Sequence, residues 1–319
     1  MNMELIKGVW REIRKHYDDP FWWKKATRYY FSSLVHRMLC NQGGIDVPMQ
    51  DWDNLIILDA CRADLFEETI DFDRKNYKRI ISRGSTTIEW LEKNFKGRKF
   101  YDTIYVTANP FVSLKVGDSF YKIVEVWKTA FDEKVGTVLP KDVMKYALKS
   151  FKEDKRLIVH FMQPHYPFIT IKKDWRDGLK FLTMEALYGS NYLQKTSLKK
   201  HPIDVFEALQ MGLIDKNKVW KGYKSNLELV WKYVRKLIEK LSGKTVVTSD
   251  HGEMIGERIL FLPIRGYGHP RGIRNPELIE VPWLEFDGER RKIKAASHTE
   301  LEKNRIQKSV KKLTHRIRV

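Results

Sequence analysis

The stretch TVVTSDHGE, at residues 245–253, indicates which fold the rest of the chain adopts. Residues 245–248 form a β-branched run that is typical of a buried strand. The run ends in Asp250 and His251, two side chains that can bind metal, and Gly252 permits a tight turn. Neighbours on a strand point to opposite faces, so this pair can share one ion only past the strand end. The alternative interpretation is a polar turn that closes the strand.

A second apolar run also ends in a carboxylate. Residues 55–58 read LIIL, the continuous pattern of a strand buried on both faces of a mostly parallel sheet. Asp59 follows at once, and Arg62 lies three residues on. A carboxylate here is costly to bury without a positive partner, which is either Arg62 or a metal ion. Open α/β sheets bind ligands at the carboxyl ends of their strands, so a metal shared with Asp250 and His251 is the sharper hypothesis.

Composition predicts a globular protein in a reducing compartment. The chain has 319 residues, 42% of them hydrophobic, which is enough for one large α/β domain with appendages. Two cysteines, Cys40 and Cys61, exclude a disulfide scaffold. No run approaches the roughly 20 apolar residues of a membrane span, and the N-terminus lacks a secretory apolar region. We therefore expect a cytoplasmic protein, with a peripheral position at the inner membrane face as an option.

The net charge of +18 is concentrated at the two ends. Residues 288–319 hold 11 Lys and Arg against 3 Asp and Glu, and residues 1–44 hold 8 against 4. Aromatic and basic residues alternate in FWWKKATRYYF, at residues 21–31. Such a helix either lies in a membrane interface or packs on the main domain, with docking the commoner outcome. The basic ends favour an anionic partner such as a lipid headgroup or a phosphorylated substrate.

Two motifs resemble those of a known superfamily. ILDACRAD, at residues 57–64, is similar to the first-strand motif of the alkaline phosphatase and sulfatase superfamily, and TSDHGEMIGE, at residues 248–257, to its late metal-binding motif. The resemblance covers approximately residues 50–287. It implies an α/β three-layer sandwich, with a mostly parallel central sheet and helices on both faces. We expect a basic, aromatic-rich helical segment over 1–49, a catalytic domain over 50–287 with an insertion at about 170–218, and a basic tail over 288–319.

The resemblance also implies a metal site. In this superfamily the first-strand Asp, a Ser, Thr or Cys nucleophile and the late Asp-His pair bind one metal, which corresponds to Asp59, a hydroxyl, Asp250 and His251 here. Sulfatases usually carry a second Asp where this chain has Ala60, and their Cys-x-Pro-Ser-Arg segment is absent. The sequence therefore disfavours a formylglycine sulfatase. It favours the phosphatase, phosphodiesterase and phosphoryl-headgroup transferase branches.

The nucleophile is expected in RGSTTIEWL, at residues 83–91, where three hydroxyls precede a predicted helix. Ser and Thr cap helices, and the same position lets free N–H groups stabilise a phosphoryl anion. Comparison with lipoteichoic-acid-synthase-like sequences favours Ser85. The position usually held by proline, here Ile88, favours Thr86. Ser85 is narrowly preferred.

Two histidines and three further polar residues complete the predicted site. The resemblance implies that His165, in a proline-fixed loop, and His269, between glycines, bind a second metal or the substrate phosphate. His160 is interpreted as a packed core histidine. The predicted substrate contacts are Arg62, Asn109 and Arg271. Residues 280–286 are predicted to form a final edge strand, where Pro282 is tolerable.

These observations predict a metal-dependent enzyme that acts on phosphoesters through a Ser or Thr nucleophile, by hydrolysis or transfer. Nitrogen and oxygen ligands suit zinc or manganese, with calcium or magnesium as further options, as one or two ions. The expected substrate is a phosphorylated or sulfated small molecule, glycan or lipid-linked compound. One alternative is a sulfuric-ester hydrolase that needs no formylglycine. Another is a non-catalytic protein that binds membrane or nucleic acid, although nucleic acid is disfavoured because no recognised motif is present.

Overall fold

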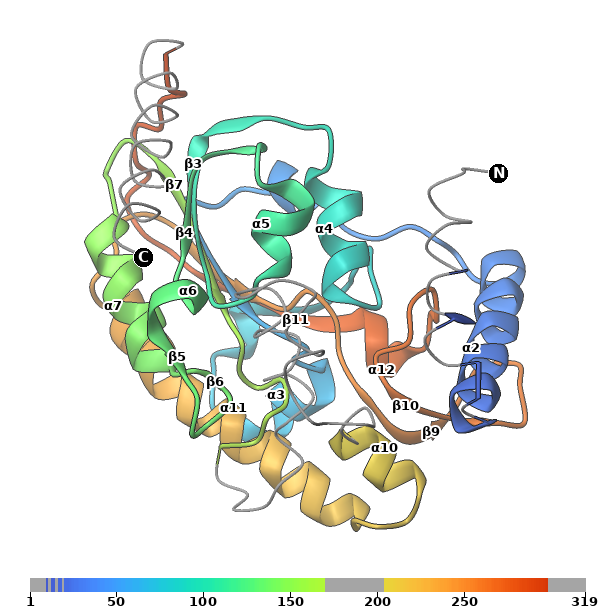
Figure 1. Ribbon diagram of the computed structural model, residues 1–319. Helices are drawn as coiled ribbons and strands as arrows, with labels where there is room; N and C mark the ends of the chain where they lie inside the picture. Colours follow the sequence, from blue (N-terminus) through green and yellow to red (C-terminus); the bar gives the residue numbers. More distant parts are fainter. Residues whose placement is uncertain (1–9, 11–12, 15–16, 19, 170–203, 298–319) are drawn as a thin grey trace, which may run out of the picture.

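A seven-stranded mixed sheet forms the centre of the protein in the computed structural model, which describes residues 20–169 and 204–297 and a few residues before them (Figure 1). The strand order is β2-β11-β8-β1-β7-β3-β4. Every strand except β11 runs in the same direction. The strands are β1 (Asn54–Leu58), β2 (Tyr77–Ile81), β3 (Phe100–Thr107), β4 (Phe120–Glu125), β7 (Arg156–Phe161), β8 (Thr245–Thr248) and β11 (Glu280–Phe286).

Helices cover both faces of this sheet because its central strand is apolar on both sides. In β1, Ile56 and Leu58 pack in a core with the helices of one face, and Leu55 and Ile57 in a second core with those of the other. The first face carries α3 (Ala63–Thr69), α7 (Pro140–Ser150) and α11 (Lys216–Ile238), and the second carries α4 (Thr87–Phe95) and α5 (Phe111–Val116). The predicted three-layer α/β fold is confirmed.

Smaller elements surround the sandwich. The 20-residue helix α2 (Pro20–Leu39) lies at one side of the molecule beside the hairpin β9 (Met254–Arg258) and β10 (Arg265–Gly268) (Figure 1). The others are α6 (Trp127–Ala130), α10 (Val205–Gln210), α12 (Pro276–Ile279), β5 (Phe131–Asp132), β6 (Thr137–Val138) and two short 3-10 helices, Val47–Met49 and Arg74–Asn76. None of the helices in the described residues is both long and apolar enough to span a bilayer.

The prediction that residues 280–286 form an edge strand is wrong. β11 lies between β2 and β8 and is antiparallel to both. Pro282 is tolerated inside the sheet because the pairing with β8 begins only at Trp283, opposite Thr248, where β8 ends. The carbonyl of Pro282 still accepts a hydrogen bond from the Thr248 hydroxyl at 2.7 Å.

Two predicted segments are only partly described. Of the proposed insertion, residues 170–203 lie outside the described part of the chain, and α10 and the start of α11 occupy the remainder. Of the basic tail, residues 298–319 lie outside it. In the described portion, Arg291 donates hydrogen bonds to the carbonyls of Asp53 and Lys155, at 2.9 and 2.7 Å. This portion therefore packs on the amino ends of the central strands.

Candidate metal centre

Asp59 and Asp250 lie side by side at the carboxyl ends of the adjacent parallel strands β1 and β8. Both side chains are buried. The Oδ1 atom of Asp250 accepts hydrogen bonds from the backbone N–H groups of Ala60 and His251, each at 3.0 Å. Its Oδ2 atom is buried and has no hydrogen-bond partner among the described residues. Since a buried carboxylate oxygen without a partner is costly, this atom fits a ligand to a cation.

The turn that brings these carboxylates together is strained. Ala60 has a φ of 59°, in the left-handed region that non-glycine residues rarely adopt. The hydroxyl of Tyr223, on α11, donates a hydrogen bond to the Ala60 carbonyl and thereby stabilises the turn. Backbone strain of this kind costs of order 1–3 kcal/mol and persists only where surrounding contacts determine it, typically at functional sites.

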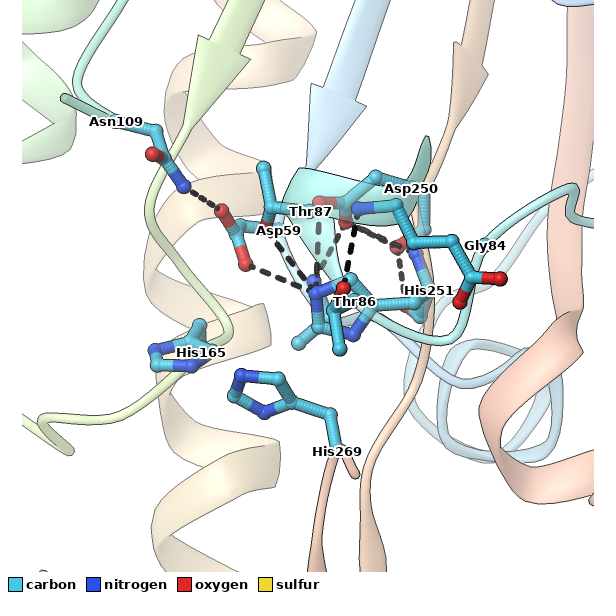
Figure 2. A network of polar contacts seen from close by, with 12 residues as sticks. Asp59, Gly84, Thr86, Thr87, Asn109, His165, Asp250, His251 and His269 are labelled. Carbon is cyan, nitrogen blue, oxygen red and sulfur yellow. Dashed lines mark hydrogen bonds and ion pairs between the residues drawn. The ribbon is translucent and has the colours of Figure 1, made fainter. Parts of the chain in front are cut away.

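His251 directs the lone pair of one ring nitrogen toward both carboxylates and the Thr87 hydroxyl. Its Nδ1 atom lies 2.9 Å from the carbonyl oxygen of Gly252, which can only accept, so Nδ1 carries the proton. Its Nε2 atom then faces Asp250 Oδ2 at 3.5 Å, Asp59 Oδ1 at 3.8 Å and the Thr87 hydroxyl at 3.2 Å (Figure 2). Ligands about 2 Å from a tetrahedral ion lie roughly 3.3 Å apart. The three distances from His251 Nε2 are therefore compatible with ligands of one divalent ion, and Asp59 and Asp250 also form a possible metal-ligand group with His160.

The three hydroxyls before α4 point in different directions. Ser85 is fully buried; its hydroxyl contacts Glu89 Oε2 and the Pro270 carbonyl, each at 3.0 Å, and accepts from the Gly272 N–H at 2.9 Å. Thr86 is the N-cap of α4 and accepts from the Glu89 N–H at 3.1 Å. Of these three hydroxyls, only that of Thr87 has a hydrogen bond to His251. The structure therefore places Ser85, the preferred nucleophile of the sequence analysis, outside this group of ligand atoms.

His165, Glu253 and His269 form a second group of possible metal ligands. Glu253 Oε1 lies 2.8 Å from His269 Nδ1 and 3.5 Å from His165 Nε2, and Glu253 Oε2 is buried without a hydrogen-bond partner. Burial would lower the pKa of His269, but the Glu253 carboxylate outweighs it and raises that pKa to about 9. The His269 ring lies 4.7 Å from that of His251, so the two groups are neighbours (Figure 2).

His160 and Asn109 hold Asp59 in place. Asn109, which follows β3, donates from Nδ2 to Asp59 Oδ2 at 2.7 Å, and His160 Nε2 on β7 lies 3.2 Å from the same oxygen. Burial would raise the pKa of Asp59, but the hydrogen bond with His160 and the neighbouring histidines hold it well below its usual range. Asp59 is thus an anion ready to bind a cation. Asn109, predicted to contact substrate, donates its hydrogen bond to this carboxylate.

The two predicted arginines do not face the ligand atoms. Arg62 is buried and pairs with Asp64 at 2.6 Å and Glu257 at 2.9 Å. It also donates to the carbonyl of Glu253 at 3.1 Å, so it fixes the loop that follows Asp250. Arg271 is 61% exposed at its side chain and pairs with Glu92 at 2.7 Å. The structure therefore gives Arg62 a positioning contact and places Arg271 at the surface.

Sequence reasoning omitted three residues that the structure brings to the site: Thr87, His160 and Glu253. Thr87 is the third hydroxyl of the run that contains Ser85 and Thr86, and Glu253 belongs to the quoted Asp-His-Gly-Glu motif. His160 was interpreted as core, and it is indeed buried. Its Nε2 atom nevertheless lies 3.9 Å from Asp250 Oδ2. Its position on a strand between two polar strand ends was the available signal.

No protein-family model matches this chain, and no curated protein matches it. Several solved structures are similar to this chain. The soluble domain of lipooligosaccharide phosphoethanolamine transferase A from Neisseria meningitidis is 14% identical over 74% of this chain and 76% of that one, with a TM-score of 0.47. The periplasmic domain of EcEptC from Escherichia coli, in complex with Zn, is 15% identical over 74% and 72%, with a TM-score of 0.42.

A protein in the alkaline phosphatase superfamily from Vibrio parahaemolyticus is 12% identical over 75% of this chain and 52% of that one, with a TM-score of 0.27. The first of these structures is named a phosphoethanolamine transferase and the last a protein in the alkaline phosphatase superfamily. At these identities the likeness concerns the fold alone.

Proposed function

We propose that the chain is a metal-dependent enzyme that cleaves a phosphoester bond and passes the phosphoryl group to water or to an alcohol. One observation carries this proposal. The unpartnered Oδ2 of Asp250, the Nε2 lone pair of His251 and the Thr87 hydroxyl converge at the N-terminus of α4, next to Asp59. A cation held by these anionic ligands, together with a hydroxyl and a helix N-terminus, would suit a phosphoryl group better than a neutral substrate.

Asp59, Asp250 and His251 would hold the ion, with the Thr87 hydroxyl beside it. A bound divalent ion would lower the pKa of a neighbouring hydroxyl and neutralise charge on phosphoryl oxygens. The protein's own contribution is positioning. Asn109 and His160 orient Asp59, two backbone N–H groups orient Asp250, and Gly252 sets the tautomer of His251.

Thr87 is the proposed nucleophile. Its Oγ1 attacks phosphorus, the Oγ1–P bond forms, and the bond from phosphorus to the leaving oxygen breaks. The hydroxyl proton passes to solvent, and the leaving oxygen takes a proton from an imidazolium or from water. Water or an alcohol then attacks the phosphothreonine and releases Thr87. Hydrolysis and transfer differ only in this second acceptor.

His165 and His269 supply positive charge across from Thr87. In the metal-free protein, with a pKa of about 9, His269 is protonated at neutral pH and donates to anionic oxygens. A second divalent ion bound by His165, Glu253 and His269 would replace that proton and supply charge at the same place. Either arrangement favours a doubly charged phosphoryl group.

The first test measures metal content and turnover together. We expect purified protein incubated with zinc or manganese to retain the metal and to hydrolyse one class among phosphomonoesters, phosphodiesters and sulfate esters. The assay should include phosphoethanolamine esters, because one of the similar solved structures is named a phosphoethanolamine transferase. Asp250→Ala is expected to lose both metal and turnover. Asp287→Ala, an exposed aspartate, is the control and keeps both.

Opposite results would reject the proposal. The proposed metal-dependent activity is rejected if the folded protein binds neither zinc nor manganese and its weak turnover survives Asp250→Ala. Turnover of sulfate esters alone would identify the sulfuric-ester hydrolase that the sequence left as an alternative.

The second test distinguishes the hydroxyls. Thr87→Val is expected to lower turnover by at least about a thousandfold, as loss of a nucleophile does. Thr86→Val loses the N-cap hydrogen bond, at about 1 kcal/mol of stability, and keeps turnover in the folded molecules. Mass spectrometry after acid quenching would locate the phosphoryl group on Thr87. Phosphate on Thr86, with turnover lost only in Thr86→Val, would assign the nucleophile to Thr86.

A further inference from the structure

Among the described side chains of helix α2, several apolar ones are exposed and two polar ones are buried, the reverse of an ordinary surface helix. Ser32 and His36 are fully buried against the domain. The opposite side shows apolar and aromatic side chains that are 37% to 77% exposed and recur at intervals of three, four and seven residues, which makes one stripe. The stripe consists of Trp23, Tyr30, Phe31, Leu34 and Met38.

Hydrogen bonds fix α2 in this orientation. The Tyr29 hydroxyl bonds to both backbone groups of Tyr267, at 3.1 Å to the N–H and 3.2 Å to the carbonyl. The Nδ1 atom of His36 accepts from the Arg274 N–H at 2.8 Å. Rotating the helix to bury its stripe would break these contacts and leave buried polar groups unpaired. The outward stripe therefore belongs to the folded state.

The loop between β9 and β10 adds two exposed apolar side chains beside α2. Leu260 and Phe261 are exposed in this loop, and Phe261 adopts a φ of 66°, which few non-glycine residues do. The Phe261 ring meets the edge of the His36 ring at 6.2 Å between centroids, so the loop lies against α2 (Figure 1). We call the α2 stripe and the exposed residues 260–261 together the aromatic face. Exposed apolar faces of this kind on a folded domain mark contact with a partner or a lipid surface.

Charge distinguishes the possible partners. The sequence of α2 contains four Lys and Arg and no Asp or Glu, and Arg258 and Arg265 flank the loop. The whole chain carries +18. Two copies that met through this face would bring like charges together. An anionic bilayer attracts the same charges, at about 1 kcal/mol for each Lys or Arg near the surface, and Trp, Tyr and Phe are the side chains that enter a lipid interface.

We propose that the aromatic face docks the protein on the surface of an anionic lipid bilayer, with α2 parallel to the bilayer plane. Phe31, Leu34 and Met38 enter the headgroup boundary, and the basic side chains contact lipid phosphates. The residues of this face are separate from the metal-capable residues, so the proposal stands without the enzymatic one.

The test is co-sedimentation of the full chain with phosphatidylcholine vesicles that contain, or lack, phosphatidylglycerol. We expect binding to the anionic vesicles only, weaker at high salt. Phe31→Glu removes an apolar group and adds a charge, so binding should fall by at least about tenfold. Leu114→Glu is the matched control, because Leu114 is 62% exposed on α5, outside this face, and its variant should bind as the wild type does.

Three results would overturn the proposal. The first is a wild-type protein that does not bind anionic vesicles. The second is Phe31→Glu binding as tightly as the wild type, after circular dichroism has shown that the variant is folded. The third is a wild-type dimer in light scattering that Phe31→Glu converts to a monomer while vesicle binding is absent, which would assign the face to a second copy of the chain.

Discussion

The Nδ2 atom of Asn109 donates a hydrogen bond to Oδ2 of Asp59 at 2.7 Å. The two residues lie 50 positions apart, after β3 and after β1, and both are buried. This bond occupies the Asp59 oxygen that faces away from His251 and so leaves Oδ1 available to an ion. In the proposed site, the Asn109 amide thereby determines which Asp59 oxygen would bind the metal.

Asn109→Ala is expected to weaken metal binding by about 10–100-fold, the usual effect of losing a hydrogen bond behind a metal ligand. Competition with a chromophoric chelator would measure the affinity for zinc and for manganese. Asn76→Ala, at an exposed asparagine, is the control and should bind as the wild type does. Equal affinities for all three proteins would contradict the assigned role of Asn109.

Ser85→Ala is expected to act on stability rather than on chemistry. The Ser85 hydroxyl is buried and joins Glu89 to the loop at Pro270 and Gly272. Its loss should lower the free energy of unfolding by about 1–3 kcal/mol, measured by urea denaturation. Turnover by the folded fraction should persist. Unchanged stability with abolished turnover would instead make Ser85 the nucleophile.

Gly252→Ala should distort the candidate metal centre through the backbone. A Cβ atom at Gly252 would overlap the carbonyl oxygen of Glu277, which belongs to a backbone that cannot move freely. We expect a loss of about 1–3 kcal/mol in the free energy of unfolding, together with weaker metal binding because His251 is adjacent. In the control, Gly43→Ala, the added atom would meet only the side chain of Asn41, so stability should hold.

Glu257→Gln should change how stability depends on pH. Burial would raise the pKa of Glu257, but the Arg62 guanidinium holds it below its usual value of 4.5. A lowered pKa in the folded state contributes stability above pH 4.5, and that stability is lost as pH falls through the folded pKa. The variant should therefore be less stable than the wild type by about 1–2 kcal/mol at pH 7, and the gap should narrow below pH 4.5. Urea denaturation at several pH values measures both; a gap that does not change with pH would contradict the ion pair.

The sequence was sufficient to predict strands β1 and β8 and the convergence of the polar residues at their carboxyl ends. Strands buried on both faces of a parallel sheet appear as continuous apolar runs, and β1 and β8 do so. Because their carboxyl ends lie at one edge, polar residues that follow them must converge. That argument brings Asp59, Asp250 and His251 together without coordinates.

The sequence was not sufficient to predict which hydroxyl near the start of α4 faces His251, or where β11 lies in the sheet. Successive residues at a helix start point about 100° apart, so two residues of uncertainty in where α4 begins exchange Ser85 for Thr87. An apolar strand pattern also does not distinguish an edge from the second position, so β11 was misplaced. Arg62 finds its second partner, Glu257, 195 positions away, a distance over which no local pattern operates.

The reversed direction of β11 determines where the chain leaves the sandwich. Phe286 pairs with Thr245, the first residue of β8, so the following residues begin at the end of the sheet opposite Asp59 and Asp250. Ala296 lies at this same end of the sheet, where its N–H donates a hydrogen bond to the carbonyl of Tyr101 at the start of β3. A fluorophore attached through a cysteine introduced at Ser297 would therefore report on the protein from the pole farthest from the candidate metal centre, and immobilisation through that position would leave the centre open to solution.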